Sequence, residues 1–211
     1  MSRATGTVCA MIAELSAFRQ DALREIGNIG LGGAVTALSE MTGVNFRLEV
    51  PEVLELTTAQ LQLVCPSEEC LMAGTIARVE GDWQGEAAFL FPWHSAQVLW
   101  RVLTGSSPSD LSELNELYES ALREVANIML GSFLTALSQL TGFELHMEPP
   151  AFAADMSAAL MSSLMVEAMY GQRELLTIET RFCVPERQFE GFFFYLPETG
   201  SLQKLFEVLN I

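Results

Sequence analysis

Two acid–amide pairs, one in each half of the chain, are the residues whose types and spacing could do chemistry. Asn28 follows Glu25 by three residues, and Asn127 follows Glu124 by the same interval, 99 residues further along. Side chains three residues apart are neighbours on the surface of an α-helix. A carboxylate binds cations, whereas an amide donates and accepts hydrogen bonds without carrying charge. Each pair can therefore contact one partner together.

The sequence around the two pairs is a tandem duplication. An alignment of residues 21–43 with residues 120–142 gives 14 identities in 23 positions. The pairs are kept although flanking positions differ, as Gly30 and Met129 do. A solvated polar face is the ordinary interpretation of one such pair on an amphipathic helix. Retention of the pair in both copies favours a function.

Both copies are predicted to be long helices, at about 18–41 and 111–140, with one apolar and one polar side. The apolar side of the first, opposite Glu25, carries Leu23, Gly27, Gly30, Ala34, Ala37, Leu38 and Met41. The polar sides carry Asp21, Glu25, Asn28, Gly32, Thr36 and Ser39, and then Ser120, Glu124, Asn127, Gly131, Thr135 and Ser138. A helical glycine costs ~1 kcal/mol relative to alanine. We therefore infer that another surface approaches closely at Gly32 and Gly131.

The order of the other predicted elements is repeated as well. In each half the long helix is followed by a strand, a helical segment, a hairpin and a last helix. In the first half these span 44–50 (ended by Pro51), 54–64 (an ambiguous segment that suits a short helix), 75–80 with 86–91, and 95–103. After a joint at 106–109 and the second long helix, they span 143–147, 153–169, 175–184 with 190–196, and 201–209.

Composition restricts the class of protein. The 211 residues carry a formal net charge of −16 and are 50% hydrophobic. A protein that binds nucleic acids or anionic membranes needs basic patches on its surface. The negative net charge of this chain therefore argues against both partners. No run of 18 apolar residues occurs, which argues against membrane insertion. The first residues do not have the pattern of a signal peptide, so we expect a cytoplasmic protein.

Cysteine and histidine offer little for catalysis or metal binding. The four cysteines are scattered and the two histidines lie in different halves. A zinc site needs a set of closely spaced ligands, and a histidine-activated nucleophile needs a nearby partner. We expect reduced structural thiols and no metal site in this chain.

The spacing within each copy resembles the CheC/CheX/FliY family of phosphatases that act on the chemotaxis response regulator CheY. The signature of that family is an Asp or Ser, a Glu, an Asn and a Pro at fixed intervals. This sequence fits it twice without a gap, at Asp21, Glu25, Asn28 and Pro51, and at Ser120, Glu124, Asn127 and Pro150. The resemblance covers about 18–209. Two complete motifs with no added flagellar-switch domain are most similar to the CheC branch.

The resemblance implies an α+β fold. It would be a single CheC-like domain over 1–211, built of two repeats at about 18–105 and 111–209. The repeats would be related by a pseudo-twofold axis and share one antiparallel sheet. Two long helices would lie side by side, with parallel axes, on one face of the sheet, and their polar sides would face outward.

The resemblance also implies a mechanism. The substrate would be an aspartyl phosphate on CheY, which carries its own Mg²⁺, so this chain would need no cofactor. Asn28 and Asn127 would orient the attacking water. Glu25 and Glu124, ionised at neutral pH, would pair with the active-site lysine of the regulator. We interpret Gly32 and Gly131 as clearance for the docked regulator.

Two other classes stay open from the sequence. One is a non-catalytic binding module, a scaffold for a response regulator or for the deamidase CheD. The other is a metal-dependent hydrolase, although no clustered ligand set accompanies the motif. CheD docks in this family at a helix that corresponds here to 156–169, which carries Met156, Met161, Met165 and Met169. Methionine-rich surfaces suit adaptable contacts, but core packing would also explain these residues.

Overall fold

The structure of the protein, a computed structural model, describes residues 17–55, 70–160, 162–163, 176–185, 187–198 and 200–210. Its helices are α1 (Ala17–Thr42), α3 (Trp93–Thr104), α4 (Glu116–Thr141) and α6 (Ser201–Leu209), with a short 3-10 helix at Leu111–Glu113. Its strands are β1 (Arg47–Glu55), β2 (Leu71–Gly81), β3 (Gly85–Pro92), β4 (Leu145–Met147), β5 (Ala151–Met156), β6 (Leu176–Val184) and β7 (Arg187–Pro197). Most of the ambiguous segment 54–64 lies outside the described residues.

Among the described residues, seven strands form one antiparallel sheet in which the two repeats are interleaved. The order is β1-β6-β7-β3-β2-β4, and β5 also pairs with β2. At the centre, β3 of the first half pairs with β7 of the second, from Gly85 opposite Pro197 to Leu90 opposite Phe192. Further out, β1 pairs with β6, and β4 and β5 pair with β2, so each half supplies the outer strands of the other. The expected shared sheet is confirmed.

Pro51 and Pro150 lie where these outer strands are irregular. Between Glu49 and Glu52, the ladder of β1 with β6 shifts register. Pro150 stands between β4 and β5, which pair with successive parts of β2. Proline has no N–H to donate to a ladder and is tolerated on edge strands and at bulges. The prediction that Pro51 ends its strand is therefore wrong, because β1 continues through it to Glu55.

Two other predicted boundaries differ from the structure. The second long helix begins at Glu116, because the Oδ1 atom of Asn115 accepts the first free N–H groups and caps it there. Residues 153–156, predicted to start the helix 153–169, instead belong to β5, and helical residues begin only at Ser157. Pairing with β2 overrides the helical preference of this alanine-rich segment. Residues from 164 to 175 lie outside the described part.

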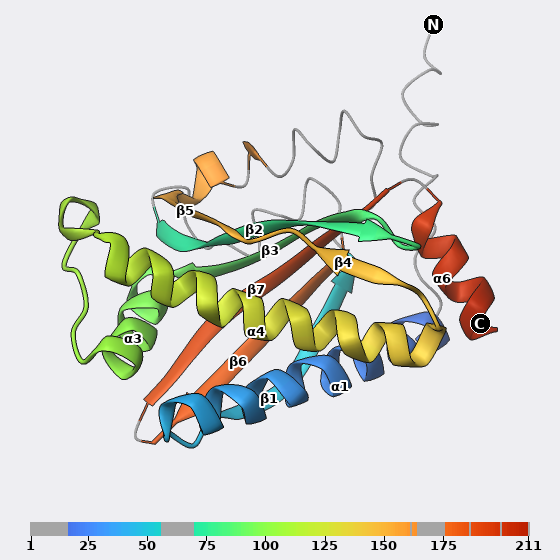
Figure 1. Cartoon of the computed structure of the whole chain (residues 1–211), viewed down its shortest axis with the longest axis horizontal. Coiled ribbons are helices and arrows are strands. Elements are labelled where there is room, and N and C mark those ends of the chain that lie inside the picture. The colour runs from blue at the N-terminus through green and yellow to red at the C-terminus, as the bar shows by residue number, and fades with distance from the viewer. Residues whose placement is uncertain are drawn as a thin grey trace, which may run out of the picture.

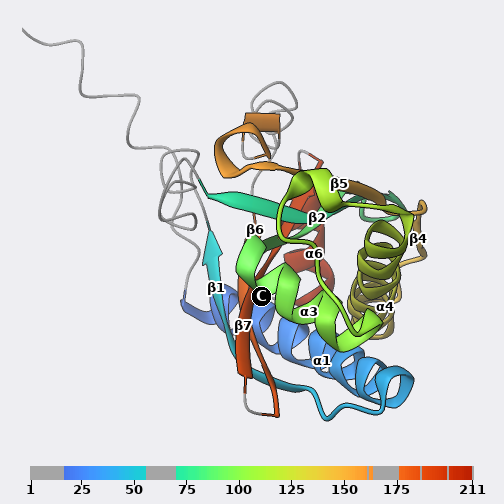
Figure 2. The same cartoon turned by 90° about the vertical axis from the view of Figure 1, so that its left-hand side faces the viewer.

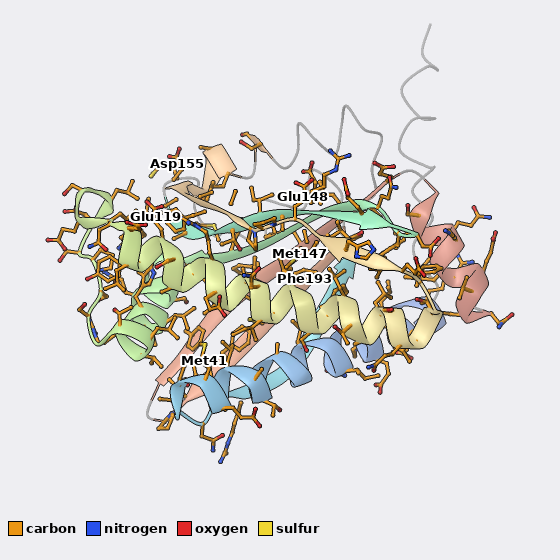
Figure 3. The ribbon with its side chains drawn as sticks, in the orientation of Figure 1. Met41, Glu119, Met147, Glu148, Asp155 and Phe193 are labelled. Carbon is orange, nitrogen blue, oxygen red and sulfur yellow. The ribbon has the colours of Figure 1, made fainter. Side chains whose placement is uncertain are left out.

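Helices α1 and α4 lie side by side on one face of the sheet and run in opposite directions (Figures 1 and 2). Midway along, Ser132 Oγ donates a hydrogen bond to the carbonyl of Gly30 at 2.7 Å. A Cβ atom on Gly30 would lie only 2.7 Å from the Cα of Phe133. Phe133 in turn contacts Phe193 of β7, with ring centroids 4.7 Å apart (Figure 3 labels Phe193). The two helices expected on one face are confirmed, and the missing side chain of Gly30 permits its close contact with Phe133.

The central strands β3 and β7 are buried on both faces. On the helix-facing side they carry Phe89, Phe91, Phe193 and Tyr195. Alternate residues form a second cluster with Leu160, namely Ala88, Leu90, Phe192, Phe194 and Leu196. Successive side chains of a strand point to opposite faces. The nearly continuous apolar sequence of these strands follows from burial on both sides.

Four hydroxyl residues kept in both repeats end the long helices. Thr42 Oγ1 and Thr141 Oγ1 each donate to the carbonyl four residues earlier, at 2.7 Å in both cases. Ser39 Oγ and Ser138 Oγ each bond to the backbone of the segment that follows the helix, at 3.0 and 2.7 Å. Ser39 and Ser138, which the helical period places on the polar sides, thus fix the connection from helix to strand.

The close contact at Gly30 predicts a stability difference between neighbouring glycines. Gly30→Ala should lower the free energy of unfolding by about 1–3 kcal/mol, because the new methyl group meets the backbone of Phe133. Gly32→Ala is the matched control: its methyl group meets nothing within 4 Å, so the better helix former should raise that free energy by up to about 1 kcal/mol. Denaturant unfolding of both variants measures the difference, and equal stability of the two would contradict the packing described.

Candidate functional site

The structure places both acid–amide pairs on exposed helix faces. On α1, Glu25 is exposed and Asn28 is half-buried, while on α4 both Glu124 and Asn127 are exposed. The buried sides of the helices carry Leu23, Ile26, Leu31, Ala34 and Leu38, and Leu122, Val125, Met129, Phe133 and Leu137. Burial of these apolar sides holds each helix in one rotational setting. The predicted outward direction of the acid–amide pairs is confirmed, although Met41, expected on the apolar side, is 48% exposed.

The four side chains of the two pairs have no partner among the described residues. Within the described part of the chain, neither the two glutamates nor the two asparagines make a side-chain hydrogen bond or an ion pair. The arginine before each glutamate is turned away. Arg24 pairs with Asp21 at 3.4 Å, and Arg123 pairs with Glu119 at 2.7 Å. Each carboxylate therefore has no cation partner among the described residues and can pair with a cation from outside.

The two pairs form separate sites. Gly30 lies beside Phe133, and the two helices are antiparallel. Six residues forward on α1 therefore correspond to six residues back on α4, which places Thr36 level with Asn127. Thr36 is eight residues beyond Asn28, so the two amides are about 12 Å apart along the helix axes at a rise of 1.5 Å per residue. The two glutamates lie further apart still, toward opposite ends of the helix pair. The arrangement offers the same groups twice and does not join them into one composite site.

Gly32 and Gly131 lie one turn beyond the asparagines. A Cβ atom on either would meet nothing within 4 Å, and neither has a positive φ. Thr36 Oγ1 and Thr135 Oγ1 donate back to the glycine carbonyls at 3.2 and 2.7 Å. Neither the packing of this chain nor its backbone conformation requires glycine there, in contrast to Gly30.

The remaining motif residues interact within their own helices or lie in the sheet region. Ser120 Oγ donates to the carbonyl of Leu117 at 3.0 Å within α4. Asp21 occupies the equivalent position on α1 and pairs with Arg24. Pro51 belongs to β1 and Pro150 to the connection between β4 and β5, so neither lies on a helix face.

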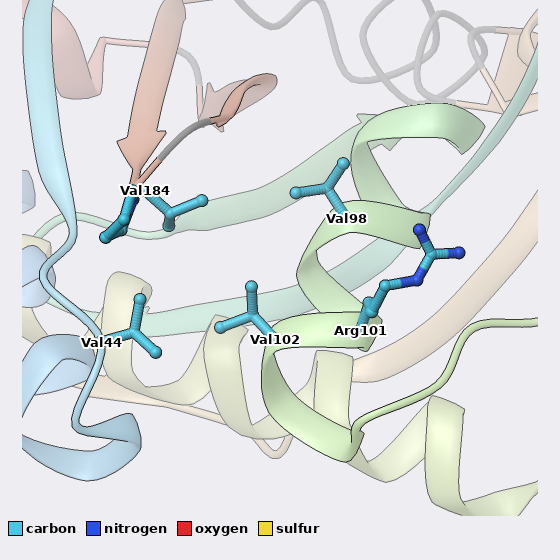
Figure 4. Close-up of a pocket in the computed structure, with 6 residues that line it drawn as sticks. Val44, Val98, Arg101, Val102 and Val184 are labelled. Atoms are coloured by element: carbon cyan, nitrogen blue, oxygen red, sulfur yellow. The ribbon is translucent and has the colours of Figure 1, made fainter.

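An apolar hollow that the sequence did not indicate adjoins the second pair. Its volume is about 540 Å³. It is lined by Met41, Thr42, Val102, Leu103, Thr104, Leu117, Ser120, Ala121 and Glu124. The lining comes from α1, α3 and α4, so no single stretch of sequence carries its signal. A second hollow of about 340 Å³, between α3 and the β6–β7 hairpin, has no motif residue in its lining (Figure 4).

The sequence matches the CheC-like family over residues 18–55 and 117–153, which include both acid–amide pairs. It is 32% identical over 196 residues to the CheY-P phosphatase CheC of Bacillus subtilis (strain 168), covering 91% of this chain and 94% of that protein. The chain belongs to the CheC-like family. The family that the duplicated motif resembles is thereby confirmed.

Two further similarities place this CheC-like chain among its relatives. It is 26% identical over 140 residues to the flagellar motor switch phosphatase FliY of Bacillus subtilis (strain 168), covering 66% of this chain and 36% of that protein. The crystal structure of Thermotoga maritima FliY has the same fold, with a TM-score of 0.70 at 21% identity, covering 93% of this chain and 98% of that one. The Thermotoga maritima protein therefore shares the α+β fold described above.

The described residues contain neither a membrane-spanning helix nor a group of metal-binding side chains. None of the helices found there has the length and apolar character needed to cross a membrane. In the same part of the chain, no three His, Cys, Asp or Glu side chains are grouped so that they could hold a metal ion.

Proposed function

We propose that this chain is a phosphatase that hydrolyses the aspartyl phosphate of the response regulator CheY, at two equivalent sites. The observation that carries the proposal is the pair of exposed acid–amide faces, whose glutamates and asparagines have no partner within the described residues. Bacillus subtilis CheC, of whose length the chain covers 94%, is named as a CheY-P phosphatase. That name supports the same substrate here.

Hydrolysis of an aspartyl phosphate needs little from the catalyst beyond correct positioning of the attacking water. An acyl phosphate is already reactive, so catalysis consists mainly of holding a water molecule in line with the bond that breaks. The water oxygen bonds to phosphorus while the bond from phosphorus to the aspartyl oxygen breaks. The products are a free carboxylate and inorganic phosphate in its dihydrogen form, which carries both protons of the water. The substrate's own Mg²⁺ offsets charge on the phosphoryl oxygens.

Asn28 and Asn127 suit the task of orienting that water. An amide accepts a hydrogen bond from the water through its oxygen and donates through its nitrogen, and it stays neutral beside an anionic phosphoryl group. Both asparagines reach solvent from the middle of a long packed helix, so the regulator can close over them without displacing this chain's own structure. Three residues earlier, each glutamate is positioned to bind a lysine of the regulator.

A non-catalytic scaffold for a response regulator or for CheD is the alternative function. Of the helix expected to dock CheD, the structure describes Met156, exposed at the end of β5, and only a few residues beyond it. CheD docking at 156–169 and a cytoplasmic location both stay predictions. Phosphate release from phosphorylated CheY, with no metal added beyond the Mg²⁺ of the regulator, would separate the phosphatase from the scaffold and from a metal-dependent hydrolase.

The two asparagines should account for catalysis. Asn28→Ala combined with Asn127→Ala should lower the rate of phosphate release by about 10²-fold or more, by analogy with the loss of one preorganised hydrogen-bonding group. Either single variant should keep activity from the intact site. The measurement is single-turnover phosphate release from phosphorylated CheY.

The matched control for this test is Gln84→Ala, which removes an exposed amide in the turn between β2 and β3. It should leave the rate unchanged. A double asparagine variant that is folded and works at the parent rate would remove both residues from the mechanism.

The two glutamates should govern affinity for the regulator. Glu25→Lys combined with Glu124→Lys places a cation where a lysine docks, and such like-charge contacts cost several kcal/mol. The dissociation constant for CheY should rise about 100-fold or more, in a titration by calorimetry or fluorescence. Glu148→Lys makes one such substitution at an exposed site beyond β4 and should have little effect. Unchanged affinity of the double variant would exclude the docking role.

Gly32 and Gly131 should be required by the partner and not by the fold. Gly32→Leu combined with Gly131→Leu should leave the free energy of unfolding unchanged or higher, since the positions are open. The catalytic efficiency toward phosphorylated CheY should nevertheless fall by about 10-fold or more, because the side chains occupy space beside the water-orienting asparagines. Full activity in stable variants would show that the regulator keeps clear of these glycines.

A further inference from the structure

Exposed apolar side chains gather beside both acid–amide pairs, at equivalent places in the two repeats. Met41 at the end of α1 is 48% exposed, and Leu140 at the end of α4 is 45% exposed. These residues are 99 positions apart, the same interval that separates the two motifs. Leu117, which lines one hollow with Met41, is 56% exposed, and Val208 of α6 is 41% exposed. Large apolar side chains that remain in water at repeated positions indicate a contact surface.

At the second site the structure gives these residues a defined arrangement. Met41 lies at the end of α1 that approaches α3 and the start of α4 (Figure 3). It lines the hollow of about 540 Å³ together with Val102, Leu117 and the motif residue Glu124. The apolar lining is therefore continuous with the carboxylate that we assign to docking.

At the first site, α6 takes the place that α3 has at the second. Trp100 of α3 packs against Tyr118, with ring centroids 5.7 Å apart. The guanidinium carbon of Arg19 lies 4.6 Å from the ring centroid of Phe206 in α6. Arg19 is 99 residues before Tyr118, so the two contacts are equivalent. Two positions further along each short helix, Val208 therefore corresponds to Val102, which lines the hollow with Met41.

We propose that each acid–amide pair is completed by a docking corner, an apolar contact for the regulator supplied by the other long helix. Met41 of α1, with Val102 and Leu117, serves Glu124 and Asn127. Leu140 of α4, with Val208, serves Glu25 and Asn28. The corner receives an apolar side chain of the phosphorylated response regulator, next to the lysine that pairs with the glutamate. This inference rests on the proposed function and deepens it.

Physical chemistry favours the regulator as the occupant. An exposed ion pair contributes little binding free energy, because water solvates and screens both charges. A glutamate–lysine contact alone therefore holds a regulator weakly. Burial of apolar surface beside it supplies the missing attraction and excludes water from the ion pair. The shared lining of Glu124 and Met41 provides such a combination within one hollow.

The antiparallel helices make the test unusually specific, since the substitution on one helix must affect the site on the other. The second site is studied alone in an Asn28→Ala background, and the first alone in an Asn127→Ala background. Met41→Ser should raise KM for phosphorylated CheY about 10-fold in the Asn28→Ala background and leave KM unchanged in the Asn127→Ala background. Leu140→Ser should show the reverse pattern. The value of kcat should change little, because the water-orienting group is intact.

Matched controls separate docking from folding. Met156→Ser makes the same change at an exposed methionine that does not line the hollow and should leave KM unchanged in both backgrounds. Met41→Leu should restore KM, because it keeps the apolar contact. Unfolding in denaturant should give the same stability for each variant and its parent.

Several outcomes would overturn the proposal. A change in KM in both backgrounds, or in neither, contradicts the crossed assignment of the docking corners. A change in oligomeric state by sedimentation with KM unchanged assigns the corner to a second copy of this chain. If neither single-site parent releases phosphate, the proposed function fails and the docking corner fails with it. Active parents with an unaffected KM remove the corner alone.

Discussion

The contact between α1 and α4 at Gly30 sets the geometry on which both sites depend. Because Gly30 has no side chain, the backbone of Phe133 can lie against it, and Ser132 ties the two helices by a hydrogen bond to the Gly30 carbonyl. The duplicated sequences diverge there in a complementary way, since Gly30 corresponds to Met129 and Ala34 to Phe133. Small residues on one helix make room for large ones on the other. The outward-facing acid–amide pairs, by contrast, are identical in the two copies.

Strand exchange binds the two repeats into one unit. Strand β1 of the first repeat pairs with β6 of the second, and β4 and β5 of the second repeat pair with β2 of the first. A cut between the repeats would leave each half with an unpaired edge and with one exposed face on β3 or β7, which are buried on both sides in the intact sheet. We therefore expect the chain to fold as a single domain, and the orientation of the two helix faces to depend on both halves being present.

The sequence predicts the parts of this protein that depend on local pattern. The long helices, both hairpins and the last helix, Ser201–Leu209, follow from periodicity and turn residues, and the acid–amide pairs follow from the duplication. The predictions that were wrong failed because of tertiary contacts. Ala153 and Ala154 favour a helix locally but belong to a strand because β2 offers them backbone partners. Pro51 continues an edge strand because the ladder shifts register there. The hollow beside Glu124 could not be predicted, because its lining combines three elements.

The arginine that precedes the glutamate pairs with a different carboxylate at each of the two sites. Asp21 adds a carboxylate one turn before Glu25, where the second site has the neutral Ser120, yet Arg24 pairs with Asp21 and compensates that charge. At the second site the corresponding arginine pairs with Glu119 instead. In both cases the arginine pairs with a carboxylate nearer the start of the helix, so the glutamate has no cation partner among the described residues. An incoming lysine thus meets the same field at either site. The side chain that closes the contact, Met41 or Leu140, distinguishes the two.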